Sequence, residues 1–216
     1  MVWYGYSTQP ETWVFGSLYP RFHLFGFVSD MRKKPSPTRL ALRDWLRIGL
    51  VQLAAHGPAG LQLENICRAA GKTRGSFYHH FKDHDRFCRT LVEFWRFENT
   101  DRIVAQTNKT RDTRGGSRLA AALDPSIERA MRNFAAVNAH AKAALAFVDK
   151  RRVDYLAQLN MQETGMKKAA ATELAEIEYA GLIGYLLLFP DRGEDRLRKV
   201  GKRLDHMITG EGQQEK

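Results

Sequence analysis

The sequence predicts an all-α protein. From residue 38 onward, apolar residues recur at steps of three and four, which is the period of amphipathic helices. Residues that cap, start and stop helices stand at the ends of these stretches, and no strand-forming run lies between them. With 216 residues, the chain is long enough for one or two domains, each with a proper core.

The first predicted helix begins at Thr38 and stops at Gly57 and Pro58, which end helices readily. We expect this helix to pack across the two that follow. Arg39, near its start, is within reach of a phosphate of a bound nucleic acid. The apolar positions that follow the helical period are Leu42, Trp45, Leu46, Gly49, Leu50 and Leu53.

Residues 61–82, LQLENICRAAGKTRGSFYHHFK, predict two short helices joined by a tight turn. Gly71 tolerates a positive φ where the first helix must stop, and Thr73 is a residue type that caps the start of the second. Residues at i, i+3, i+4 and i+7 give the first helix one apolar face, formed by Leu63, Ile66, Cys67 and Ala70.

In the second of these helices, Phe77 and Phe81 are four residues apart and can share one inward face. The other residues are small, hydroxylic, aromatic or basic, as in a helix-turn-helix whose second helix enters the DNA major groove. Gly75 is costly within a helix, but it permits close approach of the backbone to DNA. A short helix rich in core aromatics is the alternative, and it explains only the two phenylalanines. The residues left for the outer surface are Arg74, Gly75, Ser76, Tyr78, His79 and Lys82.

The chain carries a net charge of +10, from 34 Lys and Arg against 24 Asp and Glu. The excess is concentrated in residues 31–110, which carry +8, whereas residues 111–216 carry +3 and residues 1–30 carry −1. A basic region suits a polyanionic partner, because neutralising phosphates releases counterions. A solvated basic surface is the alternative, so the charge favours DNA only in combination with the helix-turn-helix pattern.

More helices are predicted beyond residue 82. A long helix is predicted over residues 83–106, and in a protein of two domains it would join them. A polar loop over residues 107–117 follows it. Asp124, with proline after it, opens the next helix as its cap. Residues 140–160 continue as a helix, and Gly165 separates it from the one that follows.

The last two predicted helices carry apolar residues at alternating steps of three and four. Such seams can join the helical hairpins of two copies into a four-helix bundle, in which Gly181 and Gly184 would let backbones approach closely. Packing within one helical domain uses the same spacing and stays open as the alternative. The seam residues are Leu174, Ile177, Gly181, Gly184 and Leu188 in one helix, and Leu197, Val200, Leu204 and Met207 in the other.

The run AAGKTRGSFYHHFKDHDRF resembles the DNA-binding motif of the tetracycline-repressor (TetR-type) family of bacterial transcriptional regulators, and the resemblance covers about residues 38–98. It implies an all-α homodimer: an N-terminal three-helix helix-turn-helix DNA-binding domain followed by a helical ligand-binding and dimerisation domain. On this basis the DNA-binding domain covers residues 38–84 and the regulatory domain residues 85–210. An N-terminal extension with a basic arm (1–37) and a polar tail (211–216) flank them.

The resemblance also implies which residues contact DNA. Two positions depart from the family pattern. A Ser or Thr usually caps the helix before the turn, where this chain has Gln62, so the capping and phosphate-binding roles of that position are open here. An apolar residue often follows the turn glycine, where this chain has Lys72, which is suited to contact a phosphate. The expected DNA-contacting residues are Arg39, Lys72, Thr73, Arg74, Gly75, Ser76, Tyr78, His79 and Lys82.

We therefore expect a cytoplasmic, ligand-responsive regulator, a repressor, that binds a palindromic double-stranded DNA operator as a homodimer. Cys67 and Cys88 make no disulfide framework, which fits a reducing cytoplasm, and no apolar run approaches the length that a bilayer requires. The sequence does not identify the small-molecule effector. Aromatic residues that could line its pocket, and that fit a plain core equally well, are Phe94, Trp95, Phe134, Phe147 and Tyr155.

A helical metal-binding protein or enzyme is the alternative from another class. His80, His84 and Cys88 recur every four residues and are of types that bind metals. We expect the helix to break after Lys82, which would separate His80 from the other two. The sequence has no HExxH motif and no phosphate-binding glycine loop after a strand, so we expect no enzyme, no cofactor and no metal. A helical nucleic-acid-binding module without an effector is a third interpretation.

Residues 1–30 differ from the rest of the chain. They are crowded with aromatic residues, Gly and Pro, follow neither a helical nor a strand period, and lack the basic start and continuous apolar core of a signal peptide. Met31 follows directly, with Arg, Lys and Lys after it. We interpret residues 1–30 as an upstream extension, with the working protein starting at Met31. An added aromatic arm that binds a partner is the alternative.

Overall fold

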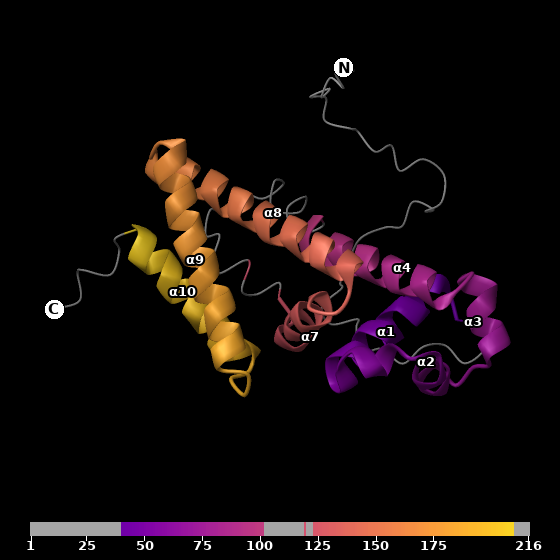
Figure 1. Cartoon of the computed structure of the whole chain (residues 1–216). Coiled ribbons are helices and arrows are strands. Elements are labelled where there is room, and N and C mark those ends of the chain that lie inside the picture. The colour runs from indigo at the N-terminus through magenta and orange to yellow at the C-terminus, as the bar shows by residue number, and fades with distance from the viewer. Residues whose placement is uncertain (1–39, 102–118, 120–122, 210–216) are drawn as a thin grey trace, which may run out of the picture. The chain divides into compact units, whose positions relative to one another are not determined.

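The structure, a computed structural model of the chain, describes residues 40–101, 119 and 123–209 (Figure 1). These residues all belong to one compact unit, which spans residues 35–216. Every regular element among the described residues is a helix, so the prediction of an all-α fold is confirmed. The α-helices are α1 (Leu42–His56), α2 (Leu63–Ala70), α3 (Arg74–His80), α4 (His84–Arg96), α7 (Pro125–Ala135), α8 (Ala139–Thr164), α9 (Lys168–Leu188) and α10 (Glu194–Thr209).

Helix α1 begins at Leu42, so the predicted start at Thr38 is about one turn too early. Ala41 is still extended, with a ψ of 162°, and its backbone N–H donates to Asp44 Oδ2 at 2.9 Å. This bond satisfies a donor just outside the helix and fixes the first turn at Leu42. Thr38 and Arg39 lie outside the described residues, as do residues 1–30.

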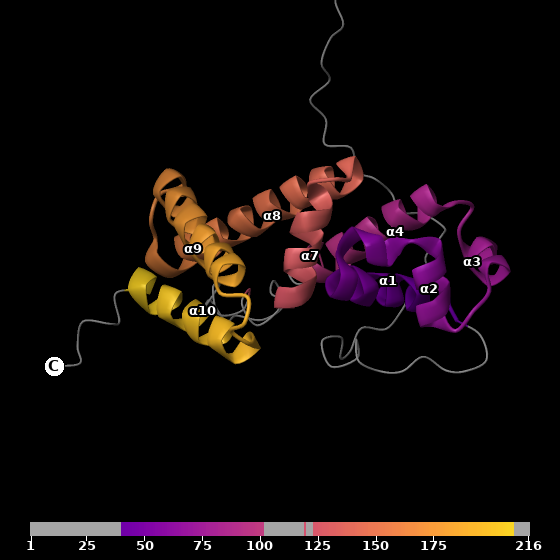
Figure 2. The same cartoon turned by 60° about the horizontal axis from the view of Figure 1, so that its bottom comes forward.

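Helix α1 packs closely on α4, and Figures 1 and 2 both show it beside α4 and α2. A β-carbon at Gly49 of α1 would come within 2.8 Å of the ring of Phe87 in α4, so the close approach requires glycine at this position. The predicted apolar face of α1 is confirmed, since all its members except the half-buried Leu42 are buried: Trp45, Leu46, Gly49, Leu50 and Leu53.

The long helix α8 contacts α4, α7 and α9, and α9 in turn pairs with α10 (Figure 1). Apolar residues from these last three helices form one core cluster, which includes Leu156 of α8, Leu182 of α9 and Leu197 of α10. This cluster fixes α9 and α10 against α8. None of the described helices is long and apolar enough to span a membrane.

The predicted starts and stops in the second half are confirmed. Asp124 Oδ1 accepts backbone N–H groups of Ser126 and Ile127 at 2.9 and 3.2 Å and caps α7. Gly165 has a φ of 71° and ends α8. The helix predicted over residues 83–106 is less regular, because α4 ends at Arg96 and a π-helical turn, η2 (Phe97–Asp101), follows it. The predicted loop at 107–117 and the tail at 211–216 lie outside the described residues.

Candidate nucleic-acid interface

The turn between α2 and α3 is built as the sequence predicts. Gly71 adopts the left-handed conformation with φ 60° and ψ 35°. The backbone N–H groups of Gly71 and Lys72 donate to the carbonyls of Arg68 and Cys67 at 3.1 and 3.0 Å, which closes the end of α2. Gln62, at the start of α2, makes no side-chain cap bond. The tight turn therefore depends on the glycine and on backbone bonds.

Side-chain caps start α3 and also α4, the helix that follows it. Thr73 Oγ1 accepts the backbone N–H of Ser76 at 3.3 Å and starts the helix. Phe81 is already extended, with a φ of −127° and a ψ of 127°, so the helix lasts only seven residues. Asp83 Oδ1 then accepts the backbone N–H of Arg86 at 2.7 Å and starts α4. The predicted helix break is confirmed, but it begins at Phe81, just before Lys82.

Two buried phenylalanines attach α3 to the helices behind it. Phe77 and Phe81 are almost fully buried, and their ring centroids lie 5.0 Å apart. The Phe77 ring also contacts Trp45 of α1 edge-on at 5.6 Å and Phe87 of α4 at 5.3 Å. Such aromatic contacts bury much apolar area and hold the rings in defined orientations. The rotation of α3 about its axis is therefore fixed by α1 and α4.

With α3 fixed in this way, its polar residues face solvent. Tyr78 is 50% exposed although it is aromatic, because its ring lies beside Phe77 and not within the core. Lys72 and Ser76 are half-buried. The remaining predicted contact residues that the structure describes are exposed: Thr73, Arg74, Gly75, His79 and Lys82.

Gly75 leaves open space on the outer face of α3. A β-carbon there would meet only Thr73 Oγ1, at 3.7 Å, which is an ordinary contact. The fold of the chain therefore does not require glycine at this position, in contrast to Gly49. A binding partner that approaches α3 from outside could come close to the backbone at this point.

Arg74 has a partner that the sequence analysis missed. Its guanidinium forms an ion pair with Glu64 of α2, and both side chains are exposed. The turn at Gly71 brings these two positions together, although they are ten residues apart. An acid near the start of the preceding helix was the only available signal. The pair is too exposed to hold α3 in place.

Residues 47–86 match the model of the bacterial regulatory proteins of the tetR family. The match runs from the middle of α1 to the start of α4 and includes all of α2, the turn and α3. The matched segment is therefore a helix-turn-helix of the tetR type at α2 and α3, and the protein is a DNA-binding transcriptional regulator. No curated protein matches the sequence.

The three residues of the metal-site alternative do not gather in this fold. His84 Nε2 lies 2.7 Å from the carbonyl of Leu61, and its Nδ1 lies 3.8 Å from Cys88 Sγ. His80 lies before the helix break, and its ring faces Trp45 at 6.2 Å. Burial, with a smaller contribution from Asp85, raises the pKa of the Cys88 thiol to about 11, so the metal-binding thiolate is disfavoured. Among the described residues no three metal-ligand side chains come together.

The five aromatic residues predicted to line an effector pocket occupy different surroundings. Trp95, Phe134 and Tyr155 are buried, and Tyr155 belongs to the core cluster shared by α8, α9 and α10. Phe94 is half-buried beneath the guanidinium of Arg43, and the exposed Phe147 lies under that of Arg96. The effector pocket stays a prediction.

The predicted dimer residues separate into two groups by their exposure. Leu197 is buried in the core of its own chain, and three others are half-buried beside it or on α9: Leu174, Val200 and Leu204. Ile177, Leu188 and Met207 are 68%, 74% and 73% exposed, respectively. A β-carbon added at Gly181 would lie 3.5 Å from a Leu204 methyl, whereas one added at Gly184 would have nothing within 4 Å.

Proposed function

We propose that the protein is a ligand-responsive repressor, which binds a palindromic operator as a homodimer in the cytoplasm and has no enzymatic activity. Residues 38–84 would bind DNA, and residues 85–210 would dimerise and bind the effector. The observation that carries the proposal is the division of α3. One face is locked by Phe77 and Phe81, and the other presents Arg74, Tyr78 and His79 to solvent.

This division suits reading of a major groove. Arg and His side chains donate to acceptor atoms on base edges, and hydroxyl groups of Ser76 and Tyr78 both donate and accept. Lys72, Thr73 and Lys82 flank the helix, where backbone phosphates would pass. Gly75 would let the start of α3 come close to the DNA. Arg39 extends the expected contacts to the segment before α1.

Selection of bound fragments from the genomic DNA of the source organism, with the purified full chain, tests the DNA-binding proposal. We expect enrichment of one sequence family with two inverted half-sites, because two α3 helices related by a two-fold axis read the same sequence in opposite directions. Enrichment without any shared sequence would contradict the proposal.

Support for the homodimer comes from the exposed apolar side of α9 and α10. Three large apolar side chains, Ile177, Leu188 and Met207, are each more than two-thirds exposed, and open space lies beside Gly184. Burying such side chains against a second copy would gain about 25 cal/mol for each Å² of apolar surface. A two-fold arrangement would place the same apolar side of each copy against the other.

Replacing Gly184 with Glu tests this interface with little disturbance of the single chain. Because nothing lies within 4 Å of the added β-carbon, we expect the variant to fold. An unpaired charge in a closed interface is strongly disfavoured, so we expect a shift from dimer to monomer in analytical ultracentrifugation. Ala169→Glu, at an exposed position near the start of α9, is the matched control and should stay dimeric. A monomeric wild-type protein at micromolar concentration would contradict the homodimer.

A further inference from the structure

Two neighbouring residues of η2 hold different parts of the molecule. Glu98 forms an ion pair with Arg43 of α1, with 2.5 Å between Oε1 and Nη2, and the Glu98 side chain is only 5% exposed. The next residue, Asn99, accepts a hydrogen bond at its backbone carbonyl from Arg152 Nη2 of α8 at 3.3 Å. One peptide unit therefore separates a contact to α1 from a contact to α8.

The contact to α1 leads directly to the DNA-binding helix. Arg43 stands two residues before Trp45, whose ring packs edge-on against Phe77 of α3. Trp45 and Phe77 are both fully buried, so a shift of α1 cannot leave α3 behind without opening this contact. The position of Glu98 is in this way connected to the orientation of α3.

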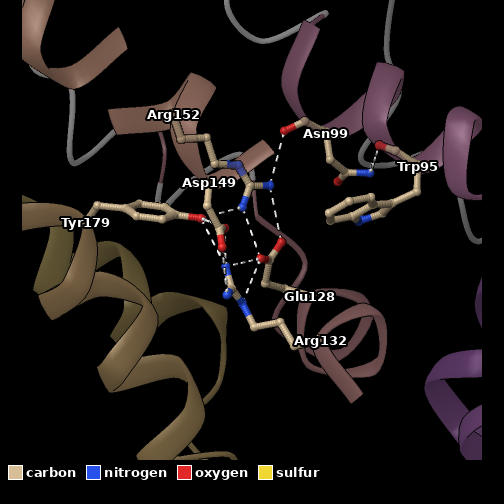
Figure 3. Close-up of polar contacts among 7 residues, drawn as sticks. All are labelled: Trp95, Asn99, Glu128, Arg132, Asp149, Arg152 and Tyr179. Atoms are coloured by element: carbon tan, nitrogen blue, oxygen red, sulfur yellow. Dashed lines mark hydrogen bonds and ion pairs between the residues drawn. The ribbon is translucent and has the colours of Figure 1, made fainter. Parts of the chain in front are cut away.

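The contact to α8 leads into a group of charged residues that we call the Arg152 cluster: Glu128, Arg132, Asp149, Arg152 and Tyr179 (Figure 3). Arg152 is fully buried and donates to both carboxylate oxygens of Glu128, at 3.0 and 3.2 Å, and to the Tyr179 hydroxyl at 3.2 Å. Arg132 donates to Glu128 at 2.9 Å and to Asp149 at 2.7 Å, and the Tyr179 hydroxyl donates to Asp149 at 2.6 Å. The cluster joins α7, α8 and α9.

Electrostatic interactions keep the side chains of this cluster charged and restrict changes in their arrangement. Burial alone would lower the pKa of the Arg132 and Arg152 guanidinium groups, but the acids and Tyr179 that surround them raise it above its ordinary value. Because buried charges must keep their partners, the cluster cannot change its arrangement gradually. A movement of α7 or α9 would have to break or exchange these bonds, and Asn99 would follow Arg152.

The turn itself is suited to such a role. η2 is a π-helical turn, whose hydrogen bonds span one residue more than those of an α-helix, and such turns concentrate at functional sites. Asn99 Nδ2 donates to the Trp95 carbonyl at 3.0 Å and so secures the turn to the end of α4. α4 continues back to Phe87, which touches Phe77 and Phe81.

We infer that η2 sets the orientation of α3, with Arg43, Glu98 and Arg152 as positioning residues for operator recognition: the Arg152 cluster holds Asn99, and Glu98 holds α1. The inference rests on the proposed function, since it concerns a dimer that reads two half-sites. We expect none of the three residues to contact DNA. Their effect is on how well the two α3 helices match the distance between half-sites.

Arg43→Gln and Glu98→Gln test the inference with the full-length chain. A series of operators in which the half-site spacing changes by one base pair at a time is measured for affinity with each variant. We expect the wild type to prefer one spacing. In both variants, the ratio of the affinity for that spacing to the affinity for the others should fall about tenfold. A simple charge effect can be distinguished from a loss of spacing preference. The two changes alter the net charge in opposite directions, so a charge effect would shift the overall affinity of the two variants in opposite directions.

Lys150→Gln is the matched control, because it breaks an exposed ion pair with Asp154 on α8 and should leave the spacing preference unchanged. The Arg43 side chain is 38% exposed, so its variant should fold, and circular dichroism verifies this. Folded variants with the wild-type spacing preference would overturn the inference while leaving the proposed function intact. A wild type that binds no operator with two half-sites would overturn both.

Discussion

The outer face of α3 and the Arg152 cluster are both rich in polar side chains, but they hold them in opposite ways. The residues of the Arg152 cluster are largely buried and make many mutual bonds, all within the chain. On α3, Arg74 has one exposed ion pair, and Tyr78 is half exposed at the edge of an aromatic core. Polar groups that are satisfied internally stabilise one arrangement of helices, whereas exposed ones on a rigid helix are available to a partner.

The largest effect should follow from breaking the Arg152 cluster. Replacing Arg152 with Met leaves the buried Glu128 with only one of its two arginine partners, so we expect a loss of up to about 3–5 kcal/mol in the free energy of unfolding by urea. The double variant with Glu128→Leu should recover more than half of this loss. Lys150→Met, which breaks an exposed pair, should cost less than about 1 kcal/mol. A loss of similar size in Arg152→Met and Lys150→Met would contradict the comparison.

A second buried glutamate sharpens the comparison. Burial and the nearby carboxylate of Asp205 raise the pKa of Glu178 from 4.5 to about 7, with a smaller rise from Glu163 and an opposing hydrogen bond from Asn160. Because the folded protein binds this proton more tightly than the unfolded chain, the contribution to stability is complete below about pH 4.5. It is lost as the pH rises to 7.

Glu178→Gln should remove this dependence, so its free energy of unfolding should exceed that of the wild type by about 2–3 kcal/mol at pH 8, with a smaller difference at pH 5. Denaturation at a series of pH values provides the measurement. Glu173→Gln, at an exposed position on the same helix, is the control. Parallel profiles for the wild type and Glu178→Gln would show that Glu178 is ionised without cost in the folded state.

Gly75 allows a test in which stability and DNA binding should change in opposite directions. Gly75→Ala meets no close contact within the chain, and alanine favours a helix, so we expect a gain of about 0.5–1 kcal/mol in stability. The added methyl should lower operator affinity about tenfold if DNA approaches the backbone there. Equal operator affinity in the variant and the wild type would place the DNA farther from the start of α3.

The smallest effect should come from Glu64. Glu64→Gln removes the internal partner of Arg74 and one negative charge beside the proposed interface, so we expect operator affinity to increase severalfold at low salt. The gain should shrink at high salt, because the pair is exposed and screened. An unchanged affinity at all salt concentrations would indicate that Arg74 does not leave Glu64 when DNA binds.

Local signals in the sequence predicted the helix-turn-helix well. Gly71, Thr73 and the four-residue spacing of Phe77 and Phe81 act within one or two turns, so their conformations follow from the nearest neighbours. The confirmed cap at Asp124 is of the same kind. The predicted start of α1 at Thr38 was wrong, because the Ala41 backbone N–H donates to Asp44 Oδ2 and fixes the first turn at Leu42.

Contacts between distant residues could not be predicted in this way. Glu128 and Arg152 are 24 residues apart on different helices, and nothing in their helical periods distinguishes them from exposed charges. The ion pair of Arg43 and Glu98 spans 55 residues, and the π-helical turn that carries Glu98 has no sequence signature. Leu197 follows the predicted seam, but the seam does not reveal that it is buried in its own chain.

The affinity of the selected operator for Arg74→Ala and Tyr78→Ala tests most directly whether the outer face of α3 binds DNA. Each change should weaken operator binding by about 1–3 kcal/mol. The melting temperature and the oligomeric state should stay those of the wild type, because neither side chain belongs to the core. Lys150→Ala, which removes an exposed charge on α8, should bind as the wild type does. If all three variants bind the operator equally well in a gel-shift titration, α3 is not the DNA-reading helix.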